Sequence, residues 1–417
     1  MKIVTNYELR VTETEARRHC ERSETIRKPL CNSVSSQCTS VKQKNSYTEN
    51  HREPQRTTEK KNSVTRLLSY SVIQLLCYSV IQLFSYFSCL AQNFSPQCEN
   101  TQRIMFYNVE NLYDTQHDLG KNDYEFLPDG VRYWTNSRLT SKLKNLYKVF
   151  SANGTPAPPT IIALCEVEND FVLQKLIETT PLKNFGYDFV HHESPDIRGV
   201  DCALLYRKQN FGLCDSHPFQ ITFPFDTASK TRDILYVKGV LFEEHLIHIF
   251  VNHWPSRYGG QAPTMPKRNY VAQRLRKICD SILNDNPNAN ILILGDLNDD
   301  PTDESVSQFL CGQRSPTDTL LLTNLSLPLF QKGEGTIKHG TQWSLFDQAI
   351  VSPALTDGRN GLQICNDALI FNHDFLFVDD ETNMGKKLFR TYNGMTYAGG
   401  YADHLPVGVD VKKVRKE

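Results

Sequence analysis

The stretch ILILGDLNDDP, residues 291–301, passes directly from an uninterrupted apolar run into acidic and amide residues. An apolar run without alternation predicts a β-strand buried on both faces, and such strands occur inside layered α/β folds. Because side chains two apart in a strand point to the same side, we expect Asp296 and Asn298 to face one way. Turn formation accounts better for the following DDP segment than for this pair. The pair is therefore the first candidate for chemistry, with Asp296 accepting a proton and Asn298 orienting the group that loses it.

Other apolar runs in the chain carry a polar residue at one end in the same way. They are IMFYN with Asn108, TIIALCE with Glu166, IHIFVNH with His253, SLFDQAIVS with Asp347, and YADHLPVGV with Asp403 and His404. A charged side chain buried alone costs on the order of several kcal/mol, so this recurrence predicts one shared polar pocket that holds a cation. The sequence therefore indicates metal-dependent chemistry on a phosphoester.

The order of the predicted elements indicates an α/β fold. Helical spacing covers residues 139–150, 171–177, with Asp170 as the N-cap, and 268–283; strands are expected at 161–164, 187–191, 201–206, 234–242, 246–252 and 290–295. Consecutive strands mixed with strand–helix alternation favour two stacked sheets with helices outside. No GxGxxG or GxxxxGK[ST] motif follows a strand, which argues against a doubly wound nucleotide fold.

Taken in chain order, these segments resemble the endonuclease/exonuclease/phosphatase family. The matching motifs are FYNVEN, LCEVEN, VNHWPSR, GDLND, LFDQAIVS and YADHLPVGV, and they span roughly residues 103–412. Each motif is short, but six of them in the family's order make the resemblance specific. It implies a four-layer α/β sandwich, in which two mixed β-sheets pack face to face with helices outside and the site lies at one edge of the sheets.

The resemblance implies catalytic roles for five side chains. Asp296, oriented through Asn298, is expected to be the general base that activates a water. Asp347 is expected to hold His404, which faces the scissile phosphate and stabilises its charge. His253 resembles the second histidine of the deoxyribonuclease and sphingomyelinase branches, which protonates the leaving oxygen.

Three further residues are expected to hold the metal or its waters. Glu166 and Asp403 supply carboxylates, and Asn108 supplies an amide that can hold a metal-bound water or a phosphate oxygen. Oxygen ligands of this kind suit a hard divalent cation, so the expected cofactor is Mg²⁺, with Mn²⁺ or Ca²⁺ as alternatives.

The remaining candidates concern substrate binding, and each has two interpretations. Asp201 is either the carboxylate partner of His253 or a strand-entry residue paired with Arg198. Arg198 and Arg257 either clamp phosphate oxygens bidentately or form surface salt bridges.

The net charge of the chain does not identify the substrate. Residues 1–98 contain 14 Lys and Arg against 8 Asp and Glu, and the rest of the chain contains 32 against 39, so residues 99–417 are acidic. An acidic body argues against binding a polyanion through a broad positive field. The basic residues of segment 267–277 form either a local patch or a solvated helix face.

Three functions compete on this basis. An exported nuclease that hydrolyses DNA or RNA phosphodiesters is the first hypothesis, because HWPSRYGG and FYNVENLYD resemble bacterial exported members of the family. The alternatives are a phospholipid or inositol phosphate substrate, for which the apolar segment 320–330 is the candidate membrane contact, and an inactive binding module. We expect a monomer without a stable protein partner.

The N-terminal region divides into two parts before the catalytic domain expected at residues 99–417. Residues 1–62 are polar and without apolar periodicity, which indicates disorder or a start codon assigned too far upstream. Residues 63–92 combine basic residues, an apolar stretch and small residues, as in a secretory signal, but they lie far from Met1. An uncleaved anchor, with membrane contact through residues 67–90, and a cytoplasmic location are the alternatives.

If residues 63–92 are a signal, the protein is exported to the periplasm, the envelope or the medium, and its mature form begins near Ala91 or Gln92. N-terminal sequencing of the native product tests this prediction. A cytoplasmic product that retains Met1 would contradict it.

Overall fold

The computed structural model describes residues 101–154, 156–313 and 320–414. The two N-terminal segments predicted above, residues 1–62 and 63–92, lie outside this part of the chain. No helix in these three ranges is long and apolar enough to cross a membrane.

The first sheet has β1 at its centre and is mixed. Its order is β13 (Leu362–Ile364), β19 (Val407–Lys413), β1 (Thr101–Leu112), β2 (Ile161–Val167), β4 (Asp201–Arg207) and β3 (Tyr187–His191), with β14 (Leu369–Ile370) also paired to β19. β1 and β2 run parallel, and the other pairs are antiparallel.

The second sheet repeats this plan around a parallel pair, β7 and β8. Its order is β5 (Phe211–Phe219), β6 (Ile234–Leu241), β7 (His245–His253), β8 (Ile291–Asp296), β12 (Asp347–Val351) and β9 (Thr323–Asn324). All six residues of β8 are buried, as the apolar run predicted.

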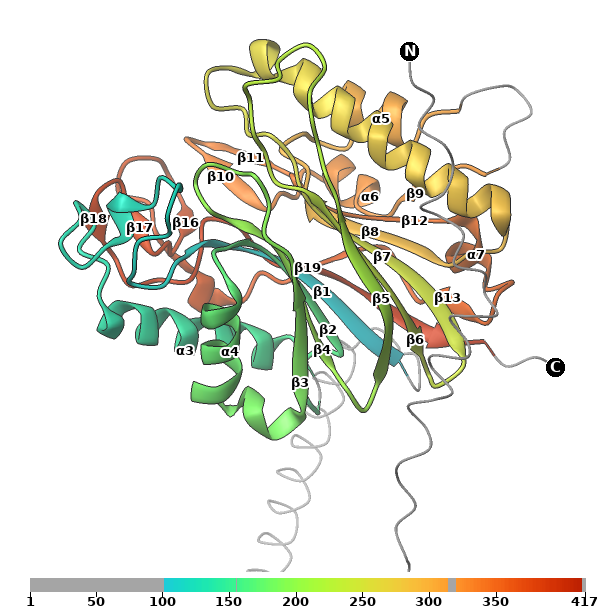
Figure 1. The fold of residues 1–417 in the computed structure, drawn as a ribbon, viewed down its shortest axis with the longest axis horizontal. Coiled ribbons are helices and arrows are strands. Elements are labelled where there is room, and N and C mark those ends of the chain that lie inside the picture. Colours follow the sequence, from blue (N-terminus) through green and yellow to red (C-terminus); the bar gives the residue numbers. More distant parts are fainter. Residues whose placement is uncertain (1–100, 155, 314–319, 415–417) are drawn as a thin grey trace, which may run out of the picture. The chain divides into compact units, whose positions relative to one another are not determined.

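Three hydrophobic cores separate four layers. One core lies between the sheets, with residues such as Phe106 and Leu294 from both of them. A second lies between the first sheet and the helices α3 (Asn136–Ala152) and α4 (Asp170–Thr179), and a third between the second sheet and α5 (Gln261–Asp285) (Figure 1). The predicted four-layer sandwich with two mixed sheets is confirmed.

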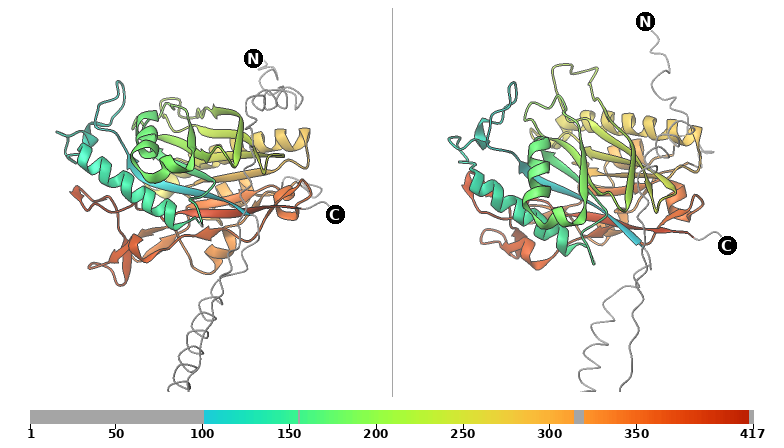
Figure 2. Two further views of the ribbon diagram at one scale, coloured as in Figure 1. Left: turned by 90° about the horizontal axis from the view of Figure 1, so that it is seen from below. Right: turned by 60° about the horizontal axis from the view of Figure 1, so that its bottom comes forward.

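Shorter elements complete the layers and extend one end of the sheets. α6 (Leu327–Gln331) and α7 (Pro353–Asp357) are short helices, α7 contacts β13 of the first sheet and β8 of the second, and a π-type helix covers Ser305–Leu310. Three hairpins are formed by β10 (Ile337–His339) with β11 (Gln342–Ser344), β15 (Phe377–Asp379) with β16 (Lys386–Leu388), and β17 (Tyr392–Asn393) with β18 (Thr396–Tyr397). Figure 2 shows the same layers from two other sides.

Several local expectations differ from the structure. The N-cap of α4 is Asn169, whose side chain accepts from the backbone N–H of Val172, and not Asp170. α5 begins at Gln261, seven residues before the expected start, because prolines near a helix start do not break it. β5 was missed because its exposed edge carries Gly, Asp and Pro in place of an apolar pattern.

The apolar segment 320–330 is not an exposed membrane contact. Each of its leucines is buried or half-buried, and Leu322, Leu325 and Leu329 belong to the hydrophobic cores. The sequence alone could not separate core packing from membrane contact, since both require apolar side chains.

A buried histidine in the second sheet links stability to pH. His248 lies on β7, and its Nδ1 is 2.7 Å from the hydroxyl of Tyr236. Burial, assisted by Lys238, lowers the pKa of His248 to about 3, so the folded state favours the neutral imidazole. Its contribution is complete above the unfolded pKa and is lost as the pH falls toward the folded pKa.

We therefore predict that His248→Gln makes the free energy of unfolding less sensitive to acid. Between about pH 6 and pH 4 the wild type should lose roughly 1.4 kcal/mol per pH unit more than the variant. Urea unfolding at several pH values measures this difference, with His217→Gln, at a half-exposed position on β5, as the control. Identical pH slopes for His248→Gln and the wild type would show that the imidazole is not held neutral.

Candidate active site

Sheet register brings the predicted side chains to one edge. His253 at the end of β7 pairs with Asp296 at the end of β8, and Asp296 pairs with Asp347 at the start of β12. On the first sheet, Asn108 pairs with Cys165, next to Glu166. The two sheets meet face to face, so residues from both converge.

Asp296 lies at the centre of this convergence. Its Oδ2 accepts a hydrogen bond from Nδ2 of Asn108 at 3.0 Å. The same oxygen is 3.6 Å from Nε2 of His253 and 3.8 Å from Nε2 of His404. Burial raises the pKa of Asp296 to about 6, against the opposing charge of His404. A buried carboxylate between two imidazoles and an amide is placed to exchange protons.

Asn298 orients Asp296, but through the backbone. Its N–H donates to Oδ1 of Asp296 at 3.0 Å, while its side-chain amide donates to the carbonyl of Trp254 at 3.1 Å. The strand ends at Asp296, and Asn298 adopts a left-handed conformation with φ of 51°. The predicted alternation therefore does not extend to Asn298, although the two residues do interact.

His404 and Asp347 form the expected dyad. Nδ1 of His404 is 2.7 Å from Oδ2 of Asp347, and both side chains are buried. Burial alone would lower the pKa of His404, but the carboxylates of Asp347 and Asp296 outweigh it and hold this pKa well above the ordinary value. These carboxylates favour the protonated imidazole, whose Nε2 lies 3.8 Å from Oδ2 of Asp296.

His253 is the electrostatic opposite of His404. Burial, together with the positive charges of Arg232 and Arg198, holds the pKa of His253 well below its ordinary value. Its Nε2 lies 3.6 Å from Asp296 and 3.9 Å from Oε1 of Glu166, and its Nδ1 has no hydrogen-bond partner in the described residues. The surroundings of His253 thus favour the neutral imidazole, whereas those of His404 favour the protonated one.

Glu166 reaches the site through strained backbone. Its φ is 63°, and its Oε2 accepts from the backbone N–H of Asn111 at 2.9 Å. Glu110, Asn111 and Asn298 also have positive φ, so four of the seven left-handed non-glycine residues in the described ranges occur in the site motifs. Such strain, of the order of 1–3 kcal/mol each, concentrates where geometry serves function.

Asp403 is held by a residue that the sequence analysis missed. Nη2 of Arg390 donates to its Oδ2 at 2.7 Å, and Nε of Arg390 lies 3.2 Å from Oε1 of Glu110. Burial opposes the charge on Asp403, but His404 and Arg390 outweigh it and lower the pKa of Asp403. Glu110 could have been found from the sequence, because it is a charged residue two positions after Asn108 in a buried strand. Arg390 lies in an irregular segment, where no pattern marks it.

A buried lysine holds the two segments that carry Arg390 and Asp403. Nζ of Lys142, on α3, donates to Oγ1 of Thr391 at 2.6 Å and to the carbonyl of Tyr401. Burial lowers the pKa of Lys142 to about 8, although Glu110 opposes the shift. Lys142 lies three residues after Leu139 on the apolar face of its helix, and this position was the sequence signal that was missed.

The predicted pairing of Asp201 is wrong. Its Oδ2 lies 3.6 Å from Nε2 of His191, and its Oδ1 accepts from the backbone N–H of Ser194 at 3.0 Å. Asp201 opens β4, whose neighbour β3 ends at His191, whereas His253 belongs to the other sheet. The alternative partner, Arg198, contacts Asp196 and Glu166 instead.

The two candidate phosphate-binding arginines differ. Arg198 is 40% exposed, with Nη1 3.6 Å from Oε1 of Glu166, so its guanidinium is available beside the site. The guanidinium of Arg257 is already engaged, because its Nε donates to the carbonyl of Asn298 at 2.8 Å and its Nη2 contacts Asp299 and Asp303. The structure therefore corrects the second assignment: Arg257 anchors the loop after β8.

Two of the basic residues predicted on α5 do not lie on a basic surface, whereas Lys267 and Arg274 are half-buried and Lys277 is exposed. Arg268 is completely buried, with Nε 2.8 Å from Asp299, and Arg276 is buried with Nη1 donating to the carbonyl of Leu310 at 2.9 Å. Neither the local basic patch nor the solvated face describes these two arginines, which fasten the helix to neighbouring segments.

Two sets of side chains at this edge are candidates for holding a cation, and in the described residues the ligand atoms of one set lie close together. Asp296, Asp347 and His404 offer ligand atoms within 4.8 Å of one another. The predicted set of Glu166, Asp403 and Asn108 is not part of that group, but its oxygen-only donors fit a hard cation better, since His404 is already bonded to Asp347. The residues present therefore fit a metal.

Comparison with known proteins agrees with this geometry. The model of the endonuclease/exonuclease/phosphatase family matches residues 103–413. The chain belongs to this family. Its members are metal-dependent phosphoesterases, which places this chain among the hydrolases. No curated protein matches the sequence.

Solved structures of the family share low identity with this chain. The human Nocturnin catalytic domain with bound sulfate is 18% identical, with 75% of this chain and 95% of that chain covered and a TM-score of 0.45. A family protein from Bacteroides thetaiotaomicron is 14% identical, with 76% and 99% covered and a TM-score of 0.47. A mannosyl-6-phosphatase of the same species is 14% identical, with 74% and 99% covered and a TM-score of 0.44.

The contrast between the two arginines is testable. We predict that Arg257→Ala lowers the free energy of unfolding by about 1–3 kcal/mol, because it removes a partner from the buried carboxylate of Asp299. Arg198→Ala should leave the melting temperature unchanged and lower the rate of phosphoester hydrolysis about 10- to 100-fold, the loss of one charge-assisted hydrogen bond. Calorimetry and steady-state kinetics measure the two effects. Equal loss of stability in both variants would contradict the assignment.

Proposed function

We propose that this protein is a Mg²⁺-dependent nuclease that hydrolyses nucleic acid phosphodiesters by in-line attack of an activated water. The observation that carries the proposal is the pair of buried histidines on either side of Asp296, at 3.6 and 3.8 Å from one carboxylate oxygen. A diester needs both charge stabilisation at the phosphoryl oxygens and a proton for the leaving alkoxide. Two imidazoles in different protonation states can divide these tasks.

Glu166 and Asp403, with Asn108, would hold the metal. Both carboxylates are partly open to solvent, with 12% and 23% of the side chain exposed. Bound there, Mg²⁺ would supply Lewis-acid charge to the phosphoryl oxygens. Mn²⁺ or Ca²⁺ would use the same oxygen donors.

Asp296 is the general base in this proposal. Asn108 and the backbone N–H of Asn298 fix its two oxygens, so its carboxylate keeps one orientation while it accepts the proton of the attacking water. His404, cationic and held by Asp347, donates Nε2–H to a non-bridging oxygen and stabilises the charge that develops there. The buried dyad needs no reorganisation during the reaction.

His253 gives the proton to the leaving oxygen. The imidazole is neutral without substrate, but an anionic phosphodiester beside it favours the protonated form. Arg198 and His253 both approach Oε1 of Glu166, at 3.6 and 3.9 Å, so Arg198 would contact the phosphate near this imidazole. Because residues 99–417 are acidic, nucleic acid would be contacted only locally, at this edge. We also expect the protein to act as a monomer.

We predict that the full-length protein with Mg²⁺ nicks plasmid DNA and cleaves bis-p-nitrophenyl phosphate, and that a chelator abolishes both activities. Asp296→Asn and His404→Ala should each lower the rate at least about 100-fold with the fold intact, since a general base or an oxyanion donor contributes about that much. His339→Gln, a surface histidine near this edge, serves as the control.

A parallel assay with RNA, sphingomyelin, inositol phosphates and p-nitrophenyl phosphate separates the alternatives. If nucleic acid stays intact while a lipid, an inositol ester or a monoester is cleaved, the nuclease proposal fails and the phosphoesterase assignment stands. If the Asp296 and His404 variants keep full activity on every substrate, the mechanism fails as well.

A further inference from the structure

A cluster at the junction of β3 and β4 lies outside the active site described above. We infer that His191, Glu193 and Asp201 form a second divalent-cation site, of the kind that takes Zn²⁺, which fastens the loop between these strands. The inference is independent of the proposed function.

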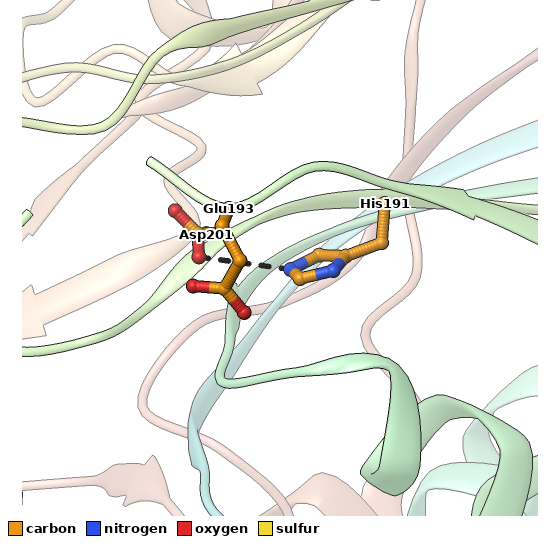
Figure 3. Close-up of side chains that lie close together, drawn as sticks. All are labelled: His191, Glu193 and Asp201. Atoms are coloured by element: carbon orange, nitrogen blue, oxygen red, sulfur yellow. Dashed lines mark ion pairs between the residues drawn. The ribbon is translucent and has the colours of Figure 1, made fainter. Parts of the chain in front are cut away.

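The three side chains converge on one point, as Figure 3 shows. One ligand atom from each, an imidazole nitrogen and two carboxylate oxygens, lies within 4.8 Å of the others. His191 ends β3 and Asp201 opens β4, so both are fixed by the sheet, while Glu193 belongs to the loop that joins them. Two rigid ligands and one adjustable ligand are a suitable arrangement for capturing an ion.

Two buried atoms of the cluster have no hydrogen-bond partner in the described residues. They are Nε2 of His191 and Oδ2 of Asp201, which face each other at 3.6 Å, too far for a hydrogen bond. Only 2% and 1% of the two side chains are exposed. A buried polar atom left unsatisfied costs about 1–3 kcal/mol, so both atoms point to a ligand between them.

The other nitrogen of His191 is already engaged. Nδ1 is 2.8 Å from Oδ1 of Asp170 at the start of α4. A carboxylate can only accept, so Nδ1 carries the proton and donates it to Asp170. This leaves the lone pair on Nε2, which is the tautomer and orientation that a metal-binding histidine requires.

The remaining contacts leave ligand atoms available. Oδ1 of Asp201 accepts from Ser194, which leaves Oδ2 for an ion. Glu193 is 55% exposed, and its Oε2 has a long contact of 3.7 Å with Nζ of Lys121. Oε1 of Glu193 can therefore turn toward the other two ligands.

A simple ion pair explains the cluster less well. A protonated His191 between Asp170 and Asp201 would donate from both nitrogens, but the second distance of 3.6 Å provides no hydrogen bond. One imidazole with two carboxylates matches Zn²⁺, which binds nitrogen and oxygen ligands tetrahedrally and would take a water as its fourth ligand.

An ion at this position would fasten a loop that borders the active site. The loop, residues 192–200, carries Arg198, whose Nη1 lies 3.6 Å from Glu166. It also carries Asp196, which accepts from Nη1 of Arg232 at 3.0 Å. The ligands lie at both ends of the loop, so occupancy would restrict its motion and that of Arg198.

Titration of the metal-free full-length protein with Zn²⁺, followed by calorimetry, tests the inference, and Co²⁺ absorption gives a second readout. The active site is expected to bind divalent ions too, so the stoichiometry is compared between variants. We predict one equivalent fewer for His191→Gln and Asp201→Asn than for the wild type, and no loss for the matched control His192→Gln, whose ring faces Ser216. Asp170→Asn should weaken this binding about 10- to 100-fold.

The buried variants His191→Gln and Asp201→Asn could lose binding because they misfold, so Glu193→Gln is a second test. Glu193 is exposed, and its replacement leaves the core intact. It should weaken the same binding event at least about tenfold, and Zn²⁺ should slow amide exchange in residues 192–200 of the wild type but not of the Glu193 variant. If His191→Gln and Glu193→Gln, both folded, bind Zn²⁺ with the affinity and stoichiometry of the wild type, the site does not exist.

Discussion

The structure of the site depends on keeping the carboxylate of Asp296 buried among groups that come from both sheets. A lone buried carboxylate is costly, and here the cost is offset by an amide from the first sheet, a backbone N–H, and a cationic imidazole. These partners reach Asp296 only because the two sheets pack face to face with their polar strand ends at one edge. The inter-sheet core therefore positions the chemistry as well as stabilising the fold.

The opposite charge states of the two histidines follow from this packing. His404 lies between two carboxylates, whereas His253 lies near Arg232 and Arg198, and both are buried. The same residue type thus acquires different properties from its neighbours alone.

The sequence predicted the layers and the convergence of Asn108, His253, Asp296, Asp347 and His404 at one edge, because strands buried on both faces with polar residues at their ends form a recognisable pattern. It predicted the contact of Asp347 with His404 through family resemblance. It failed for Asp201, because its partner His191 lies on a neighbouring strand and sequence does not show which strands are adjacent. It also failed for Arg257, whose partners lie in the irregular segment after β8, and for Arg390, which has no local signal. Pairings across loops depend on tertiary contacts that short-range patterns do not encode.

Neither sheet carries a complete set of reacting groups. Asn108, Glu166 and Asp403 belong to the first sheet and its approach, and His253, Asp296 and Asp347 to the second. Any partial opening that slides one sheet over the other would dismantle the centre before either layer lost its own hydrogen bonds. On heating, activity would therefore be lost before secondary structure. A partly opened molecule would not cleave phosphoesters at all, so it could not attack the wrong substrates.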